Sequence, residues 1–217
     1  MLGIGKLKIQ RVIKLIELKT EAMIGKGLHR ECYIHPDDSD RCIKVVVLRG
    51  EEETRREQAY YKFLQKRQIG WEMLPKFYGV EETSMGAGAV FDLVRDADGE
   101  VGKTFEIYFS SSELTKQNLQ GLITSLQALK VYLFRYNIIT MSIKPKNIIY
   151  QRQDEQNGVA VIIDNIGNSD VIPIGSYYRY FGKIKMTRKW NKFITLLKKD
   201  YPENTLLQGQ LEQLLSK

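Results

Sequence analysis

Residues 140–149 read TMSIKPKNII, and residues 161–167 read VIIDNIG. Each contains an apolar run of the kind that forms a β-strand, with a polar segment next to it. Asn147 comes just before the first run, and Asp164 comes just after the second. Oxygen ligands from an asparagine and an aspartate on neighbouring strand ends suit Mg²⁺, which takes few protein ligands and completes its shell with phosphates. A strand-ending turn is the alternative interpretation of the Asp-x-x-Gly segment.

A lysine and a glutamate further upstream are a second pair of candidate site residues. Lys44 is the one charged residue in the apolar stretch CIKVVVL, residues 42–48, where a cation is costly unless an anionic group meets it. Glu57 lies on the next predicted element, a helix over 52–67, and is a candidate partner for that lysine. The alternatives are a lysine on the exposed side of a half-buried strand and a solvated acid on a helix.

A glycine turn between the first two predicted strands completes the set. Residues 25–30 read GKGLHR. Gly25 and Gly27 let the backbone approach a ligand closely, and their bare amides can face phosphate oxygens. An ordinary hairpin turn explains the same glycines, so the turn gains its meaning from its place before the lysine, glutamate, asparagine and aspartate.

The hydrophobic periodicity predicts an α+β fold in two lobes. The first part is rich in strands joined by short turns, which suggests an antiparallel sheet with one helix. Its expected strands cover residues 16–24, 31–35, 42–48, 76–83 and 89–95, with a turn at 36–40. The second part is mainly helical with a short hairpin. Its expected helices cover 114–136, 187–199 and 204–216, and its expected strands cover 147–150 and 159–163.

A turn or linker at 96–99 divides the two parts. The prediction is therefore an N-lobe over residues 1–94 and a reduced C-lobe over 95–217. The N-lobe consists of a basic segment, residues 1–15, followed by a nucleotide-binding sheet. The C-lobe holds the segment with Asn147 and the basic C-terminal helices.

The composition excludes several classes of protein. Apolar residues make up 43% and charged residues 27% of the 217 residues, which is typical of a globular protein and not of a disordered or fibrous one. Two cysteines cannot form a disulfide framework. No apolar run is long enough to span a membrane, and no secretory signal is expected. These features predict a cytoplasmic location.

The net charge of +7 is unevenly distributed. Residues 177–199 hold eight lysines and arginines and no acidic residue, and residues 1–19 are also basic. Such segments bind nucleic acid, anionic lipid or an acidic partner, or they form the solvated face of a helix. No zinc-finger, RNP-type or helix-turn-helix pattern is present, so no nucleic acid is expected as a partner, and peripheral membrane contact stays open. The aromatic residues of the C-terminal segment either form a docking surface or pack as a helical hairpin on the second lobe.

Taken in order, the polar elements resemble the protein-kinase-like fold. In this resemblance the glycine turn matches the nucleotide-covering loop, Lys44 matches the strand lysine of V-A-I-K, and Glu57 matches its helix partner. Asn147 matches the asparagine of H-R-D-L-x-x-x-N, and Asp164 matches the aspartate of D-F-G. The resemblance implies ATP and Mg²⁺ as ligands, with the metal on the last two residues. It implies nucleotide binding by Gly25, Gly27, Arg30, Lys44 and Glu57.

Three longer segments are similar to the YrbL family, bacterial proteins named as PhoP regulatory network proteins. They read GKGLHRECYIHPDDSDRCIKVV from residue 25, YNIITMSIKPKNIIYQ from residue 136 and DNIGNSDVIPI from residue 164. The family is described as kinase-like without a settled activity, and its name refers to the control of its expression. The resemblance implies a regulatory role in a bacterial envelope-stress network.

The chain departs from the pattern of an active kinase. Ser142 stands where a kinase has its catalytic aspartate, and a serine hydroxyl is not a general base near neutral pH. Lys144 is a second candidate catalytic residue in this loop. Arg30 replaces the third glycine of the nucleotide loop, where it can assist or block phosphate binding. The expected function is that of a pseudokinase or a weak, atypical phosphotransferase that lacks the usual catalytic aspartate.

Two other functions stay open on the sequence. One is an active small-molecule or envelope-sugar kinase, because the second lobe is short and compact relatives of the fold phosphorylate small acceptors. The other is a non-catalytic adaptor that acts through its basic C-terminal surface. The sequence identifies neither the acceptor nor a regulatory protein partner.

Overall fold

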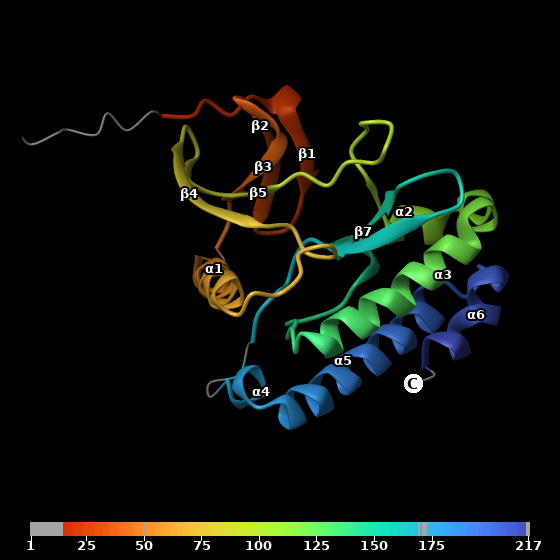
Figure 1. Cartoon of the computed structure of the whole chain (residues 1–217). Helices are drawn as coiled ribbons and strands as arrows, with labels where there is room; N and C mark the ends of the chain where they lie inside the picture. The colour runs from red at the N-terminus through yellow and green to blue at the C-terminus, as the bar shows by residue number, and fades with distance from the viewer. Residues whose placement is uncertain (1–14, 50, 169, 171–172, 216–217) are drawn as a thin grey trace, which may run out of the picture.

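The computed structural model describes residues 15–49, 51–168, 170 and 173–215. Within them the chain forms an α+β fold, with an antiparallel sheet at one end and most of the helices at the other (Figure 1). The α+β prediction is therefore confirmed. Of the basic segment predicted over residues 1–15, all but Leu15 lies outside the described residues.

A five-stranded antiparallel sheet is formed by the first part of the chain, in the order β1-β2-β3-β5-β4. Its strands are β1 (Met23–Lys26), β2 (Arg30–His35), β3 (Asp38–Val46), β4 (Phe77–Thr83) and β5 (Gly86–Asp92). Because side chains alternate between the faces of a strand, Ile43 and Val45 pack on one face with the segment before β1. Cys42 joins the main core on the other face. Lys44 shares the face of Cys42.

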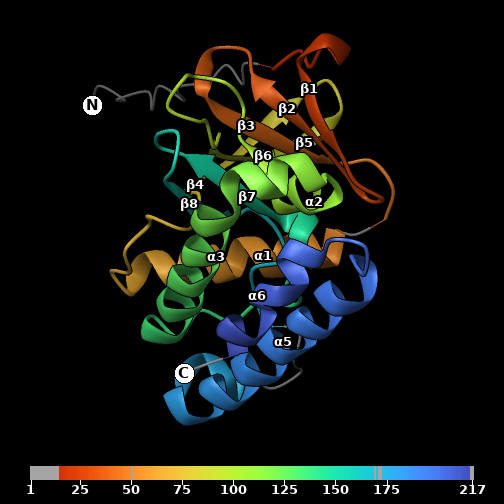
Figure 2. The ribbon, with the colours of Figure 1, turned by 90° about the vertical axis from the view of Figure 1, so that its right-hand side faces the viewer.

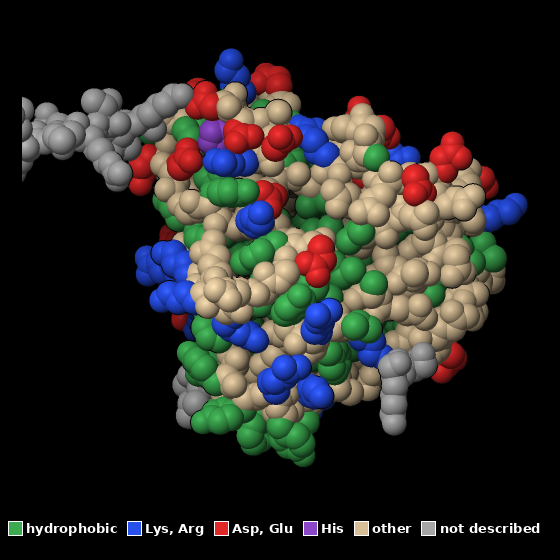
Figure 3. Space-filling model, viewed as in Figure 1, with side chains coloured by type: hydrophobic (Ala, Val, Ile, Leu, Met, Phe, Trp, Pro, Cys, Tyr) green, Lys and Arg blue, Asp and Glu red, His purple; other side chains and the backbone are tan. Residues whose placement is uncertain are grey.

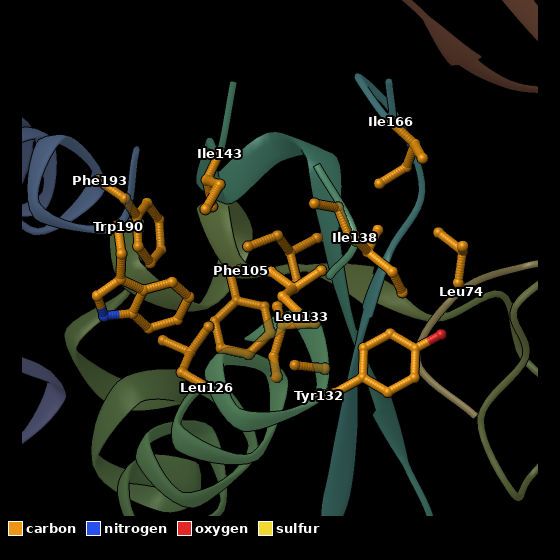
Figure 4. Packing of buried hydrophobic residues seen from close by; sticks show 14 of the residues in the cluster. Leu74, Phe105, Leu126, Tyr132, Leu133, Ile138, Ile143, Ile166, Trp190 and Phe193 are labelled. Carbon is orange, nitrogen blue, oxygen red and sulfur yellow. The ribbon is translucent and has the colours of Figure 1, made fainter. Parts of the chain in front are cut away.

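The second part of the chain is mainly helical. Its helices are α2 (Phe105–Ser110), α3 (Ser112–Arg135), α4 (Ile174–Tyr177), α5 (Arg179–Asp200) and α6 (Thr205–Leu215). A small antiparallel sheet consists of β6 (Lys103–Thr104), β7 (Ile148–Arg152) and β8 (Gly158–Ile162), in that order. α3, α5 and α6 lie side by side (Figures 1 and 2). Leu126 and Leu133 of α3 meet Trp190 and Phe193 of α5 in one core (Figure 4).

Asn204 ties the start of α6 to α2 and α3. Its side chain is buried, its Oδ1 accepts from the Leu207 amide at 3.0 Å, and its Nδ2 donates to the Phe109 carbonyl at 2.9 Å and to the Thr115 hydroxyl at 2.8 Å. One amide group thus satisfies a free N–H at the helix start and two buried acceptors.

Helix α1 (Glu51–Lys66) connects β3 to β4 and matches the helix predicted over 52–67. Hydrogen bonds connect α1 and the residue after it to the helical part of the chain. The Tyr60 hydroxyl accepts from the Ile139 amide at 2.8 Å. Just beyond the helix, Arg67 donates to the Tyr136 carbonyl at 2.6 Å, and a guanidinium there satisfies an acceptor that the end of α3 leaves free.

Several predicted boundaries are wrong. The strand predicted over 16–24 begins only at Met23, because residues 20–22 form a 3-10 turn closed by the Ala22 amide on the Lys19 carbonyl. The turn predicted at 36–40 is shorter, since β3 already starts at Asp38. Helix α5 starts eight residues before the predicted 187, and α2 and α4 were not predicted. Both are too short to show a helical period in the sequence.

The segment predicted as a turn or linker at 96–99 is a structured turn. The Gly99 amide donates to the Asp96 carbonyl at 2.9 Å. The Asp96 carboxylate is buried and accepts from the amide and from the Nε of Arg152, at 2.9 and 2.7 Å. Since Arg152 ends β7, this turn is fixed to the small sheet.

Candidate functional site

A cleft of about 560 Å³ lies beneath the five-stranded sheet. Its upper wall comes from the glycine turn, β2 and β3, and its lower wall comes from residues 144–149 and 163–165. Elements far apart in the sequence therefore enclose one space. Seven of the nine predicted site residues line it: Gly25, Gly27, Arg30, Lys44, Lys144, Asn147 and Asp164.

Lys44 reaches across the cleft from β3. Its ammonium donates to the Ile163 carbonyl at 2.5 Å and lies 4.7 Å from the centre of the Phe91 ring. A carbonyl and an aromatic face both stabilise a half-buried cation. The lysine is therefore held directly next to Asp164, the residue after its acceptor.

Arg30 is the residue that joins the two carboxylates of the cleft. Its guanidinium, at the start of β2, donates to Glu57 with one nitrogen and to Asp164 with the other. The predicted pairing of Glu57 with Lys44 is thus wrong, since the ion pair of Glu57 is with Arg30. A planar fork of donors serves two carboxylates at once, whereas the single ammonium of Lys44 is directed to a carbonyl.

Glu57 is almost completely buried at the centre of this network. Its side chain is 2% exposed, and its second oxygen accepts from the Ile166 amide at 3.4 Å. Burial raises the pKa of Glu57, and the nearby Arg30 and Lys44 only partly oppose that effect. A buried carboxylate of this kind depends on its counter-charge.

The pKa of Asp164 is shifted in the opposite direction to that of Glu57. Burial raises the pKa of Asp164, but Lys44, Arg30 and the Asn165 amide outweigh it and hold that pKa below its usual value. The same carboxylates raise the pKa of Arg30 above its usual value, although burial lowers it. Asp164 is therefore an anion held between two cations.

Asn147 and Asp164 lie on adjoining strand ends. The Ile163 amide donates to the Asn147 carbonyl at 2.9 Å, as expected from the antiparallel pairing of Ile148 with Ile162. Asn147 is 6% exposed, and its Nδ2 has no hydrogen-bond partner in the described part of the chain. A buried, unpartnered amide at a cleft wall is costly without a ligand.

The loop with Ser142 runs beside the Asp164 segment. Thr140 pairs with Ile166 across an antiparallel bridge, and the Met141 amide donates to the Asn165 carbonyl at 2.8 Å. Ser142 is half-buried but is not among the residues that line the cleft. The structure therefore places Lys144, and not Ser142, at the cleft wall.

The sequence reasoning missed two features of the cleft. The first is Phe91, which lies under Lys44 because β5 pairs with β3, a neighbour that is not next in sequence. The second is the position of the thiols of Cys32 and Cys42. They were expected to lie near each other as buried small hydrophobes, and both line the cleft. Their mutual hydrogen bond lowers the pKa of Cys32 and raises that of Cys42. Their place on adjoining predicted strands was the available signal.

The described residues contain neither a cluster of metal ligands nor a membrane-spanning helix. Within residues 15–49, 51–168, 170 and 173–215, no three His, Cys, Asp or Glu side chains are grouped as ligands for a metal ion. No helix in the same residues is long and apolar enough to cross a bilayer.

The fold and the cleft define an α+β protein in which a lysine, an arginine and two carboxylates meet beneath an antiparallel sheet. The family model described as PhoP regulatory network protein YrbL matches residues 16–198, and the chain belongs to this family. It is 38% identical over 183 residues to "Uncharacterized protein YrbL" of Escherichia coli (strain K12), which covers 83% of this chain and 87% of the relative. The protein of the same description from Shigella flexneri matches equally well.

Proposed function

We propose that this protein is a protein-kinase-like nucleotide-binding protein that holds ATP and Mg²⁺ in the cleft. The proposal rests mainly on one observation. Lys44, Asn147 and Asp164 line one space although they lie far apart in the sequence, and Arg30 joins Glu57 to Asp164. In this proposal residues 1–94 form an N-lobe and residues 95–217 form a C-lobe, with the nucleotide between them.

The residues present fit a magnesium ion. Mg²⁺ uses one or two protein oxygens together with phosphates, and Asp164 and Asn147 at the cleft wall would supply them. Asp164 Oδ1 accepts from Arg30 and Asn165, which leaves Oδ2 for a metal. The buried Asn147 Nδ2 has no hydrogen-bond partner in the described residues, and the oxygen of the same amide is the second candidate ligand.

The phosphates would meet the cations of the cleft. Lys44 supplies an ammonium on the upper wall, and the turn with Gly25 and Gly27 supplies backbone amides. Arg30 is the internal counter-charge of Glu57 and Asp164 when no metal is bound.

We infer that phosphoryl transfer is slow or absent and that the role is regulatory, as in a pseudokinase. Ser142 takes the position of the general base, and Ser142 is not among the residues that line the cleft. A general base contributes about 10²–10⁴-fold to the rate. Positioning and charge neutralisation carry most of phosphoryl transfer. A weak transferase is therefore compatible with the loss of the base.

Isothermal titration with ATP and Mg²⁺ tests nucleotide binding by the full chain. We expect binding by the parent protein and its loss in Asp164→Ala. Asp154→Ala, on the turn between β7 and β8, is the control and should bind normally. Absence of binding by the parent protein would contradict the proposal. Radiolabelled ATP then separates a pseudokinase from a weak transferase, since only the latter releases or transfers labelled phosphate.

A further inference from the structure

A dense group of exposed apolar side chains covers α4 and the start of α5, and we call it the aromatic cluster. Each is between 38% and 72% exposed. The cluster consists of Ile174, Tyr177, Tyr178, Tyr180, Phe181 and Ile184. In Figure 3 hydrophobic side chains gather at the lower edge of the molecule, where Figure 1 shows α4 and the start of α5. Apolar patches of this density mark interaction surfaces.

The exposed face of α5 continues from this cluster into cations. Residues four apart share one face of a helix, so Ile184, Arg188 and Lys192 follow one another on the exposed side, whereas Met186 and Trp190 are buried on the opposite side. At 1.5 Å per residue, the two cations lie about 6 and about 12 Å beyond Ile184. One helix face therefore carries an apolar end and a basic continuation.

These cations have no acidic neighbours along the chain. No aspartate or glutamate occurs between Asp170 and Asp200. Lys185 pairs with Asp170 at 2.7 Å, but within the residues that the structure describes neither Arg188 nor Lys192 forms an ion pair. Lys and Arg side chains adjoin the hydrophobic lower edge in Figure 3. The surface thus presents positive charge beside apolar rings.

We propose that the aromatic cluster and the adjoining cations of α5 dock the protein on an anionic lipid bilayer. Tyrosine and phenylalanine rings bury their apolar body at the headgroup level of a membrane. An interfacial helix binds through this apolar area together with the attraction of its lysines and arginines to anionic lipid. A second copy of the chain fits less well, because a two-fold contact brings the same cations together.

Vesicle sedimentation of the full chain tests the surface. The probes are vesicles of phosphatidylcholine alone and vesicles of phosphatidylcholine mixed with phosphatidylglycerol. The apolar variant is Tyr180→Ser with Phe181→Ser, and its control is Val131→Ser, an exposed apolar residue on α3. The charge variant is Arg188→Gln with Lys192→Gln. Its control is Lys103→Gln with Lys116→Gln, two exposed lysines elsewhere.

We expect the parent protein to sediment with the anionic vesicles, and more weakly with phosphatidylcholine alone. Each removed cation weakens binding about fivefold, so the charge variant should bind about 25-fold more weakly and the apolar variant should not sediment. Both controls should bind like the parent protein. Failure of the parent protein to sediment with anionic vesicles overturns the proposal, as does equal binding by the variants and their controls. A concentration-dependent mass in analytical ultracentrifugation that the apolar variant abolishes, without vesicle binding, assigns the surface to self-association instead.

Discussion

Replacement of Arg30 by methionine removes the buried counter-charge of the cleft. Methionine keeps an unbranched stem and loses the charge and all donors. The side chains of Arg30 and Glu57 are 17% and 2% exposed, and breaking a buried pair costs about 3–5 kcal/mol. The Asp164 side chain is 32% exposed, so solvent screens that second pair. We therefore expect a loss near the lower end, about 3 kcal/mol in the free energy of unfolding.

The loss is expected to depend on pH. Burial already raises the pKa of Glu57 with Arg30 in place, and removal of the guanidinium raises it further. A carboxyl whose pKa is higher in the folded than in the unfolded protein weakens the fold as the pH rises through the folded-state value. Lowering the pH toward the ordinary glutamate pKa of about 4.3 should therefore return part of the lost stability.

Urea unfolding of the full chain, followed by circular dichroism, measures both effects. Glu57→Gln and the double variant complete a mutant cycle, in which we expect a coupling of at least about 1 kcal/mol. Arg56→Met is the control, because its pair with Glu52 on the same helix is exposed and is worth less than about 1 kcal/mol. If Arg30→Met costs no more than Arg56→Met, or if the cycle is additive, the reasoning is refuted.

Three further predictions concern packing, capping and acid stability. A Cβ at Gly182 in α5 overlaps a neighbouring side chain, so Gly182→Ala should lower the free energy of unfolding by about 1–3 kcal/mol. A Cβ at Gly209 meets nothing within 4 Å, so Gly209→Ala should raise the free energy of unfolding by about 0.4–1 kcal/mol. Equal free energies of the two variants in urea unfolding would reject this packing. Asn204→Ala should lower the free energy of unfolding by about 2 kcal/mol, and an unchanged thermal midpoint would show that its three bonds are unimportant. Hydrogen bonds from the Asn157 side chain, and then from backbone amides, hold the pKa of Asp154 below its usual value. This carboxylate therefore stabilises the fold above its unfolded-state pKa and loses that effect as the pH falls, so Asp154→Ala should flatten the stability profile below about pH 4, and identical acid limbs would contradict the assignment.

The long elements of the fold could be predicted because their sequence periods are strong. The leucines of α3 recur at helical spacing, and β3 carries a β-branched run around Lys44. Seven of the nine residues in the polar motifs line the cleft, whereas Glu57 and Ser142 do not. The helices α2 and α4 were missed because each carries too few residues for a period to appear.

The partners within the cleft could not be predicted from spacing. Lys44 was the one cation expected to pair with Glu57, whereas the actual pair with Arg30 depends on strand register and on side-chain geometry. The sequence also did not indicate which of the C-terminal aromatic residues are buried. Trp190 is buried whereas Tyr180 is exposed, although both lie among the same lysines and arginines. The helices α5 and α6 do pack on α3, but only some of the aromatic residues of α5 take part in that packing.

The anchoring of α1 has a consequence for the position of Glu57. Tyr60 holds this helix to Ile139, and Arg67 holds it to the end of α3, while Gln65 holds it to the Phe77 carbonyl of β4. The helix is therefore a brace between the sheet and the helical part of the molecule. Because Glu57 lies on this brace, its carboxylate stays between Arg30 of β2 and the Ile166 amide.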